Sequence, residues 1–227
     1  VVWTKDPTLT ESVEIPVGTS LYIEPGVTVT CKSDVQVPIE IVVLGNLYCM
    51  GTTEHPVTFT SDTKKTEDWG GIICGYNSQE VVLNHVDLAY AGATPTESSA
   101  SFQNHLFKST IDGGVPAFHF CNVNGKFVMA NCFLHDNYND QTYFTGGQGV
   151  IYNCIFADNG NATDGGEAIN VKAGCKLDIA NNIIYNACTN AFKLSNSGNS
   201  ELIPLTQLTA YNNTIVNCGW RRAKNKK

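Results

Sequence analysis

Two aspartates, Asp136 and Asp158, occupy the same position in two copies of one short sequence, NCFLHDN at residues 131–137 and NCIFADN at residues 153–159. If the copies stack as successive turns of a solenoid, the two carboxylates lie about 5 Å apart. Carboxylates that close share a proton or bind a cation, and this separation also suits a retaining glycosidase. We therefore predict that Asp136 and Asp158 form a catalytic pair. The alternative is that both lie at solvated corners, because Asp is common in turns.

Side chains next to this pair are candidates for substrate binding, namely His135, Tyr138 and Tyr143. Strict alternation along a strand would point His135 to the opposite face from the aspartate that follows it. Tyr138 and Tyr143, with Phe144 and Trp69, are candidates for an aromatic platform on which a sugar could pack.

A metal site is expected in the sequence DGGE at residues 164–167, where Asp164 and Glu167 would supply oxygen ligands of the kind that Ca²⁺ prefers. The spacing differs from the DxDxDG pattern of a calcium loop, so the alternative is an ordinary acidic turn. Asp140, Asp164 and Glu167 lie on loops that adjoin the Asp136/Asp158 pair and could complete its site. His119 stands in an apolar stretch, where a histidine is usually structural.

The repeat is what would position these groups. Short apolar stretches led by a polar residue, usually asparagine, start 24, 23, 22, 29 and 31 residues apart, at Asn84, Lys108, Asn131, Asn153, Asn182 and Asn213. A period in the twenties built from strands is typical of a solenoid. An asparagine at one corner of each turn can adopt the left-handed conformation and hydrogen-bond to its equivalents above and below. We predict that these asparagines are scaffold.

The N-terminal part alternates apolar and polar residues in short segments bounded by Gly or Pro, as at residues 17–29 and 39–47. No segment there has the 3.6-residue period of an amphipathic helix. The sequence therefore predicts an all-β chain, a single-stranded right-handed parallel β-helix. We expect one domain over residues 1–227, with N-terminal coils at 1–80, asparagine-led coils at 81–219 and a basic tail at 220–227.

Charge and cysteine content narrow the class of protein. A net charge of −7 with scattered basic residues disfavours nucleic acid as a partner, and no apolar run is long enough to span a membrane. Nine cysteines without a CxxC pair match no zinc spacing. We expect reduced, buried cysteines, with a Cys188–Cys218 disulfide as the alternative. We also expect a monomer.

Several segments together resemble a known family. GTSLYIEPGVTV at residues 18–29, VLGNL at 43–47, WGGI at 69–72 and NNTIVNC at 212–218 are similar to coils of right-handed parallel β-helix proteins of the pectin-lyase-like superfamily. The version here resembles secreted or surface-anchored proteins of gut Bacteroidetes. The resemblance implies export, to the medium or to the cell surface through a lipidated and removed N-terminus, and a polysaccharide as partner.

The resemblance leaves the activity open, because this scaffold carries lyases, hydrolases, adhesins and inert spacers. Pectate-lyase-type members use clustered acids, Ca²⁺ and an Arg or Lys base. Here no arginine precedes Arg221, so a bidentate clamp for a uronate is missing over most of the chain. Lysines are the possible substitutes, at positions 108, 126, 172, 176 and 193. We expect a protein that binds or degrades polysaccharide, as a lyase or a hydrolase. The alternative is a non-catalytic surface rod or adhesin-like glycan-binding module.

Overall fold

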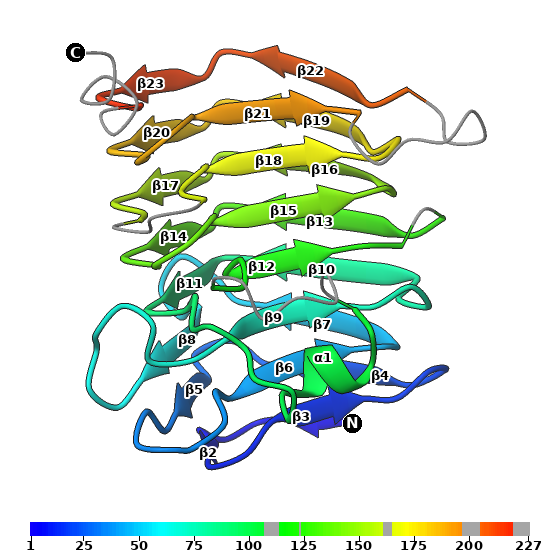
Figure 1. The fold of residues 1–227 in the computed structure, drawn as a ribbon, viewed down its shortest axis with the longest axis vertical. Coiled ribbons are helices and arrows are strands. Elements are labelled where there is room, and N and C mark those ends of the chain that lie inside the picture. Colours follow the sequence, from blue (N-terminus) through cyan, green and yellow to red (C-terminus); the bar gives the residue numbers. More distant parts are fainter. Residues whose placement is uncertain (107–113, 123, 161–164, 197–204, 220–227) are drawn as a thin grey trace.

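The chain winds into a right-handed parallel β-helix, as its sequence predicts. The computed structural model describes residues 1–106, 114–122, 124–160, 165–196 and 205–219. Each turn contributes one strand to each of three parallel sheets, and the turns stack from the N-terminus to the C-terminus (Figure 1). The sheets run without a break from the N-terminal coils into the asparagine-led coils.

The three sheets, which we call A, B and C, follow one another in every turn. Sheet A contains β1 (Val2–Trp3), β4 (Ser20–Ile23), β7 (Asn46–Met50), β10 (Glu80–Asn84), β13 (Lys126–Ala130), β16 (Gln148–Tyr152), β19 (Lys176–Ala180) and β22 (Gln207–Tyr211). Sheet B contains β2 (Thr8–Leu9), β5 (Thr28–Cys31), β8 (Val57–Ser61), β11 (Val86–Ala89), β14 (Phe133–His135), β17 (Ile155–Ala157), β20 (Ile183–Tyr185) and β23 (Thr214–Val216). Sheet C contains β3 (Val13–Ile15), β6 (Glu40–Val43), β9 (Gly71–Cys74), β12 (Phe118–Phe120), β15 (Thr142–Thr145), β18 (Ile169–Lys172) and β21 (Phe192–Ser195).

One core runs along the axis of the helix because alternate side chains of every strand point inward. In β8 the residues are alternately buried and half-buried, which is the pattern of a strand with one face in the core. Equivalent inward residues pair in register from turn to turn, and in sheet B one such column is Val29, Phe59, Leu88, Leu134, Phe156 and Ile184. The alternating apolar residues of the sequence therefore form stacked columns of contacts in the core.

Single left-handed residues make the corner between sheets A and B. Asn131 and Asn153 both have φ 55°, a conformation that asparagine tolerates better than most residues. The Nδ2 of Asn131 donates to Oδ1 of Asn84 at 3.0 Å, and the Nδ2 of Asn153 donates to Oδ1 of Asn131 at 3.4 Å. The predicted corner and its amide ladder are confirmed for these residues.

The prediction was wrong by one residue in the next two turns. Asn181 and Asn212 take the left-handed corner, with φ 58° and 54°. Asn182 is buried instead, where its Oδ1 accepts a hydrogen bond from the backbone N–H of Cys154 at 2.8 Å, and Oδ1 of Asn213 accepts one from the N–H of Asn182 at 3.0 Å. Each Asn-Asn pair thus supplies one corner and one inward amide, which the spacing alone does not distinguish.

The sequence analysis expected one more turn between Asn84 and Asn131 than the strand pairing allows. Strand β10 pairs directly with β13, and Glu80 lies opposite Lys126, so one long turn separates them. Lys108 itself lies outside the described residues. The extra length carries the short helix α1 (Ala100–Gln103), which the sequence analysis missed because four residues show no helical period. The described residues contain no helix long and apolar enough to cross a membrane.

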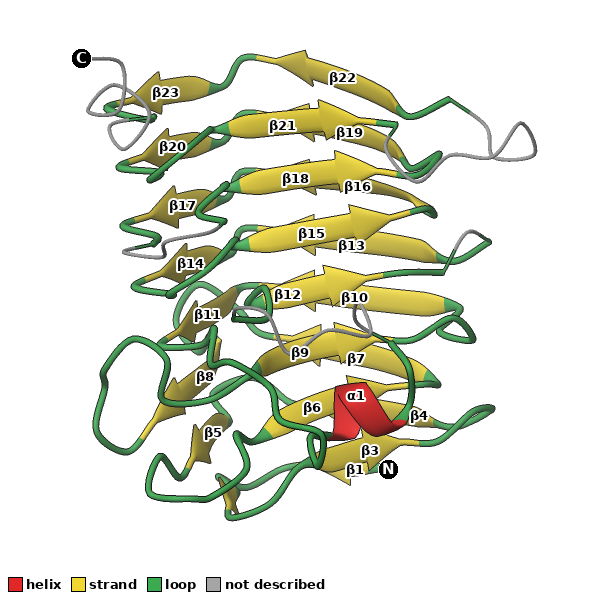
Figure 2. Ribbon diagram, viewed as in Figure 1, coloured by secondary structure: helices red, strands yellow, loops and turns green. Residues whose placement is uncertain are grey.

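Helix α1 and the chain around it cover the N-terminal half of sheet C (Figure 2). Val42 and Ile73, which point outward from β6 and β9, pack with Leu106 and Val115 of the insertion as a second small core. The fully buried Glu40 fastens the insertion, since its two carboxylate oxygens accept hydrogen bonds from N–H of Ser101 at 2.7 Å and Oγ of Ser101 at 2.6 Å.

All nine cysteines lie in the described part of the chain and all are free. Eight are buried, and burial raises the pKa of several of these thiols, including Cys31 to about 12. Cys188 and Cys218 are not joined. The expectation of reduced cysteines that pack as small apolar side chains therefore agrees with the structure.

Replacing Ser101 with Ala should lower the free energy of unfolding by about 1–3 kcal/mol, because it leaves a buried carboxylate oxygen without its hydroxyl donor. Denaturant unfolding at neutral pH would measure this change. Ser98→Ala is the matched control, since Ser98 is exposed in the same insertion. Equal midpoints for the two variants would contradict the role given to the Glu40–Ser101 contact.

Candidate functional site

The predicted catalytic aspartates lie at the corner between sheets B and C. Asp136 and Asp158 follow the register-paired strands β14 and β17 and have left-handed φ values of 50° and 48°. The Oδ2 of Asp136 lies 2.7 Å from Nδ1 of His135, while Oδ1 of Asp158 accepts a hydrogen bond from Nδ2 of Asn186 at 2.7 Å. Each carboxylate is thus engaged by a different partner. Asp136 is half-buried and Asp158 is exposed, and their role as a catalytic pair stays a prediction.

His135 does not point away from Asp136, contrary to the expectation from strand alternation. The left-handed backbone at Asp136 breaks the alternation and turns its carboxylate back toward the imidazole. The other ring nitrogen, Nε2, lies 3.0 Å from Oδ1 of Asp87 on the neighbouring strand. Phe133 stacks on the same imidazole at 4.1 Å between ring centres, so Phe133 lies on the outer face and not in the core.

Both nitrogens of this imidazole face carboxylates, which favours the imidazolium. Partial burial disfavours the charged form, but the hydrogen bonds and charges of Asp87 and Asp136 outweigh it and raise the pKa of His135 above 6.5. A histidine held in this way is a poor general base near neutral pH. Its place on sheet B is that of an ion-paired surface group.

Proton NMR titration of the imidazole would check this arrangement. We expect a pKa for His135 above its usual value, and a lower one in Asp87→Asn, because that variant removes one acceptor and one negative charge. Asp158→Asn is the control, since Asp158 contacts Asn186 instead. A histidine pKa that is the same in wild type and Asp87→Asn would show that the cluster does not hold the proton.

The proposed aromatic platform does not form. Trp69 and Phe144 are fully buried in the central core. Tyr138 is half-buried in the loop between β14 and β15. Tyr143 lies on another surface, the outer face of sheet C, so the structure does not bring Tyr138 and Tyr143 together with the buried rings.

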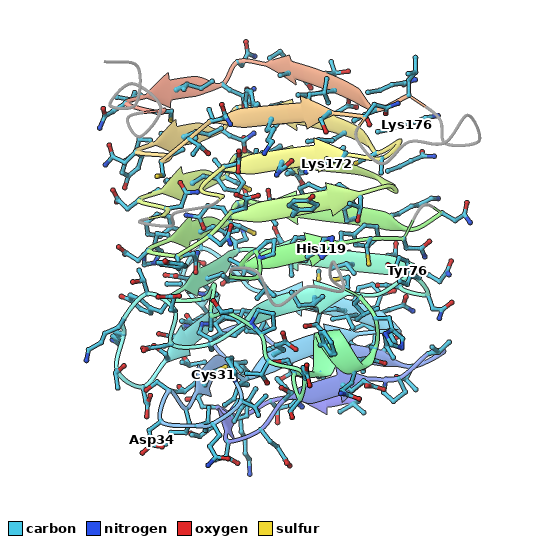
Figure 3. The ribbon with its side chains drawn as sticks, viewed as in Figure 1. Cys31, Asp34, Tyr76, His119, Lys172 and Lys176 are labelled. Atoms are coloured by element: carbon cyan, nitrogen blue, oxygen red, sulfur yellow. The ribbon has the colours of Figure 1, made fainter. Side chains whose placement is uncertain are left out.

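The outward-facing positions of sheet C carry several kinds of polar and aromatic side chain. One row crosses four consecutive strands in register and consists of His119, Tyr143, Asn170 and Lys193. We call these four residues the sheet C row. It begins at β12, one strand beyond the apolar patch that the α1 insertion covers, and His119 and Lys172 mark this face in Figure 3.

Contacts within the row orient its rings. His119 meets the ring of Tyr143 edge-on, with 5.1 Å between ring centres, and its Nε2 lies 3.1 Å from Oγ1 of Thr145. Lys172 holds its ammonium 4.7 Å from the centre of the Tyr143 ring, a cation–π contact. An aromatic ring, a lysine and a histidine are therefore held against one another.

Beneath the row lies a buried carboxylate pair, Asp140 and Glu167. The Oδ1 of Asp140 accepts hydrogen bonds from the N–H of Gly166 at 2.7 Å and of Glu167 at 2.8 Å, and its Oδ2 accepts one from Nδ2 of Asn170 at 2.9 Å. The Oε1 of Glu167 accepts from Nζ of Lys193 at 3.0 Å. Both acids are almost fully buried, so the network ties the loop before β18 to the sheet.

The two carboxyl groups have pKa values that are shifted in opposite directions. Burial and the adjacent Glu167 raise the pKa of Asp140 from 3.8 to about 8. Burial acts in the same direction on Glu167, but the hydrogen bond from Asp140 and the charge of Lys193 overcome it and lower the pKa of Glu167 to about 2. At neutral pH we therefore assign a protonated Asp140, an ionised Glu167 and a compensating Lys193.

The predicted metal ligands fall in this region. Asp164 lies outside the described residues, and Glu167 is engaged by Lys193 and by Nδ2 of Asn190 at 3.0 Å. Within the described residues, no group of three or more His, Cys, Asp or Glu side chains could hold a metal ion. A Ca²⁺ site thus stays a prediction. Asp140 had been named only as a supporting group, because its partner Glu167 is distant in sequence.

Residues 2–104 match a protein family described as the pectate-lyase like beta helix domain. The match and the three parallel sheets together support a parallel β-helix of the pectin-lyase-like type. The family match covers the N-terminal coils, and the three sheets continue the same architecture through the coils that carry the sheet C row. No curated protein and no solved structure matches the chain. For the pectin-lyase-like helix described here, the match supports a role connected with polysaccharide and leaves the activity open.

Asp140→Asn should remove most of the pH dependence that this β-helix owes to the pair. Because the folded pKa of Asp140 is raised, its contribution to stability is complete below about pH 4 and is lost as the pH rises to about 8. We expect wild type to lose stability over that window relative to the variant. The Asn170 amide can rotate to accept from the new amide, so we expect a neutral-pH cost of at most about 1 kcal/mol.

Denaturant unfolding of both proteins from about pH 4 to about pH 8 would measure this difference. Asp178→Asn is the control, since Asp178 is an exposed aspartate on sheet A. Parallel stability curves for wild type and Asp140→Asn would mean that Asp140 titrates normally.

Proposed function

We propose that this protein is exported and binds an acidic polysaccharide along the outer face of sheet C. The observation that carries the proposal is the sheet C row, in which four polar or aromatic side chains stand in register on four consecutive strands. Parallel strands lie about 4.8 Å apart, so an extended polymer laid across this face follows the row, in which His119, Tyr143 and Asn170 are buried and Lys193 is half-buried. A compact ligand would be too short to span all four strands.

The chemistry of the face suits an acidic sugar chain. The Lys172 ammonium lies over the buried Tyr143 ring, so this face offers a positive charge for the carboxylate of a sugar. Lys193 is paired with Glu167, and Lys172 adds a second positive charge to this face. With lysines in place of arginine, the contact is a point charge and not a bidentate clamp.

Cleavage is the second candidate, and the Asp140–Glu167 pair favours it, because a shared proton is what acid–base catalysis requires. Both acids are only 3% and 2% exposed, so a substrate would reach them only if Lys193 moved aside. Binding can use the half-buried Lys172 and Lys193, and for this reason we rank it first. Export follows from the partner, since a polysaccharide is met outside the cell.

Affinity electrophoresis through gels that contain plant, host and microbial polysaccharides would test binding. We expect retardation by acidic polymers, weaker retardation at high salt, and a loss of about threefold or more in affinity in Lys172→Gln, because an exposed charge contributes up to about 1 kcal/mol. Lys65→Gln makes the same charge change on a distant loop and should bind normally. Equal loss in both variants would show that only net charge matters.

Cleavage is followed in the same samples, with and without Ca²⁺, through new reducing ends and the ultraviolet absorbance of unsaturated uronates. Products with absorbance would indicate a lyase, and products without it a hydrolase. Retardation without products would establish a binding protein. If neither retardation nor products appear with any polymer, the proposed function is wrong.

A further inference from the structure

A second surface, on sheet A, is hollowed into a groove that contains Lys126 and Lys176, two of the lysines that the sequence offered in place of an arginine. The groove has a volume of about 350 Å³ and crosses β13, β16, β19 and β22. It shares no residue with the sheet C row. Most of its lining comes from alternate, outward-pointing positions of these strands, so the groove runs along the axis of the β-helix.

One edge of this sheet A groove is a row of cationic and amide side chains in strict alternation. Lys126, Gln148, Lys176 and Gln207 pair in register on the four strands. The two lysines are two turns apart, which places their backbones about 10 Å from each other. Both lysines are exposed. The edge therefore offers one positive charge for every second turn.

The centre of the groove changes from apolar to polar along its length. Val128 and Val150 lie at its β13 and β16 end, and Asp178 and Thr209 continue the same row on β19 and β22. Asp178 stands two residues from Lys176 on the same face of β19. A polymer with a charge on every unit would bring one of them close to this carboxylate, at a cost in repulsion.

Beside the groove, a third row repeats with the same two-turn period. Tyr152 on β16 and Tyr211 on β22 are 38% and 54% exposed, whereas Ala130 and Ala180 at the equivalent positions of β13 and β19 are buried. Large rings thus alternate with small residues. Exposed tyrosines on a flat sheet are suited to packing against the apolar faces of sugars.

We propose that the sheet A groove binds a linear acidic polysaccharide in which charged and uncharged sugars alternate. Lys126 and Lys176 accept the charges of successive repeats, Gln148 and Gln207 hydrogen-bond the uncharged sugars between them, and Tyr152 and Tyr211 contact sugar faces. The match of the two-turn period in the lysine row and the tyrosine row selects this class over a uniformly charged chain. The inference rests on the proposed function, to which it adds a second site and a substrate class.

The test compares hyaluronan, which carries one carboxylate for every second sugar, with polygalacturonate, which carries one on every sugar. The affinity of the full chain for each is measured by affinity electrophoresis. We expect tighter binding of hyaluronan, and a loss of about fivefold to thirtyfold for it in the Lys126→Gln/Lys176→Gln double variant, because two exposed charges are removed. The loss for polygalacturonate should be smaller.

Two matched variants make the outcome decisive. Lys5→Gln/Lys65→Gln removes the same net charge from exposed positions outside the groove and should bind hyaluronan as wild type does. Lys172→Gln alters only the sheet C face. Wild-type hyaluronan affinity in the Lys126→Gln/Lys176→Gln variant, or equal affinity for both polymers, would overturn the sheet A site.

The same measurements separate this inference from the proposed function. A loss caused by Lys172→Gln alone would leave binding on sheet C and remove the sheet A site. A loss caused by the sheet A variant alone would keep this inference and remove the sheet C site. If wild type binds neither these two polymers nor any other, both proposals are wrong.

Discussion

In-register stacking of parallel strands is the constraint on which the rest of this molecule depends. Once Val29, Phe59 and Leu88 stand above one another, every outward residue is also placed above its equivalent in the next turn. The left-handed corners keep that register, because one residue such as Asn131 or Asn153 turns the chain between sheets without adding length. Inward columns supply the hydrophobic stability, and outward rows follow as a geometric consequence.

The same constraint decides where charge can be buried. Asp140 and Glu167 precede neighbouring strands of sheet C, so stacking brings their carboxylates together under the loop before β18. Two ionised acids there would repel strongly, and the raised pKa of Asp140 together with the Lys193 contact resolves the conflict. Asp136 and Asp158 are stacked in the same way, but at an exposed corner. There each finds its own polar neighbour, and the shared-proton arrangement expected of them arises one loop away.

Sequence reasoning reached the fold because a turn-length period and alternation are local signals. It also placed Asn131 and Asn153 at a corner, since asparagine tolerates the left-handed conformation. It failed where two residues compete for one role, as in the Asn181–Asn182 pair, and where a turn is lengthened, as between β10 and β13. The Asp140–Glu167 contact could not be predicted from the sequence for another reason. Its members stand in different loops, and only the three-dimensional register brings them together.

Electrostatics then distinguishes the three outer faces. Sheet B presents Asp87 and, at its corner, Asp136 and Asp158, so it repels an anionic polymer even though His135 lies between two of these acids. Sheet C presents Lys172 beside Tyr143, with the charge of Lys193 cancelled from below. Sheet A presents Lys126 and Lys176 at two-turn intervals. In a protein with an overall net charge of −7, the exposed lysines of sheet A thus repeat in a row, although Glu80 lies opposite Lys126 and Asp178 stands in the same groove.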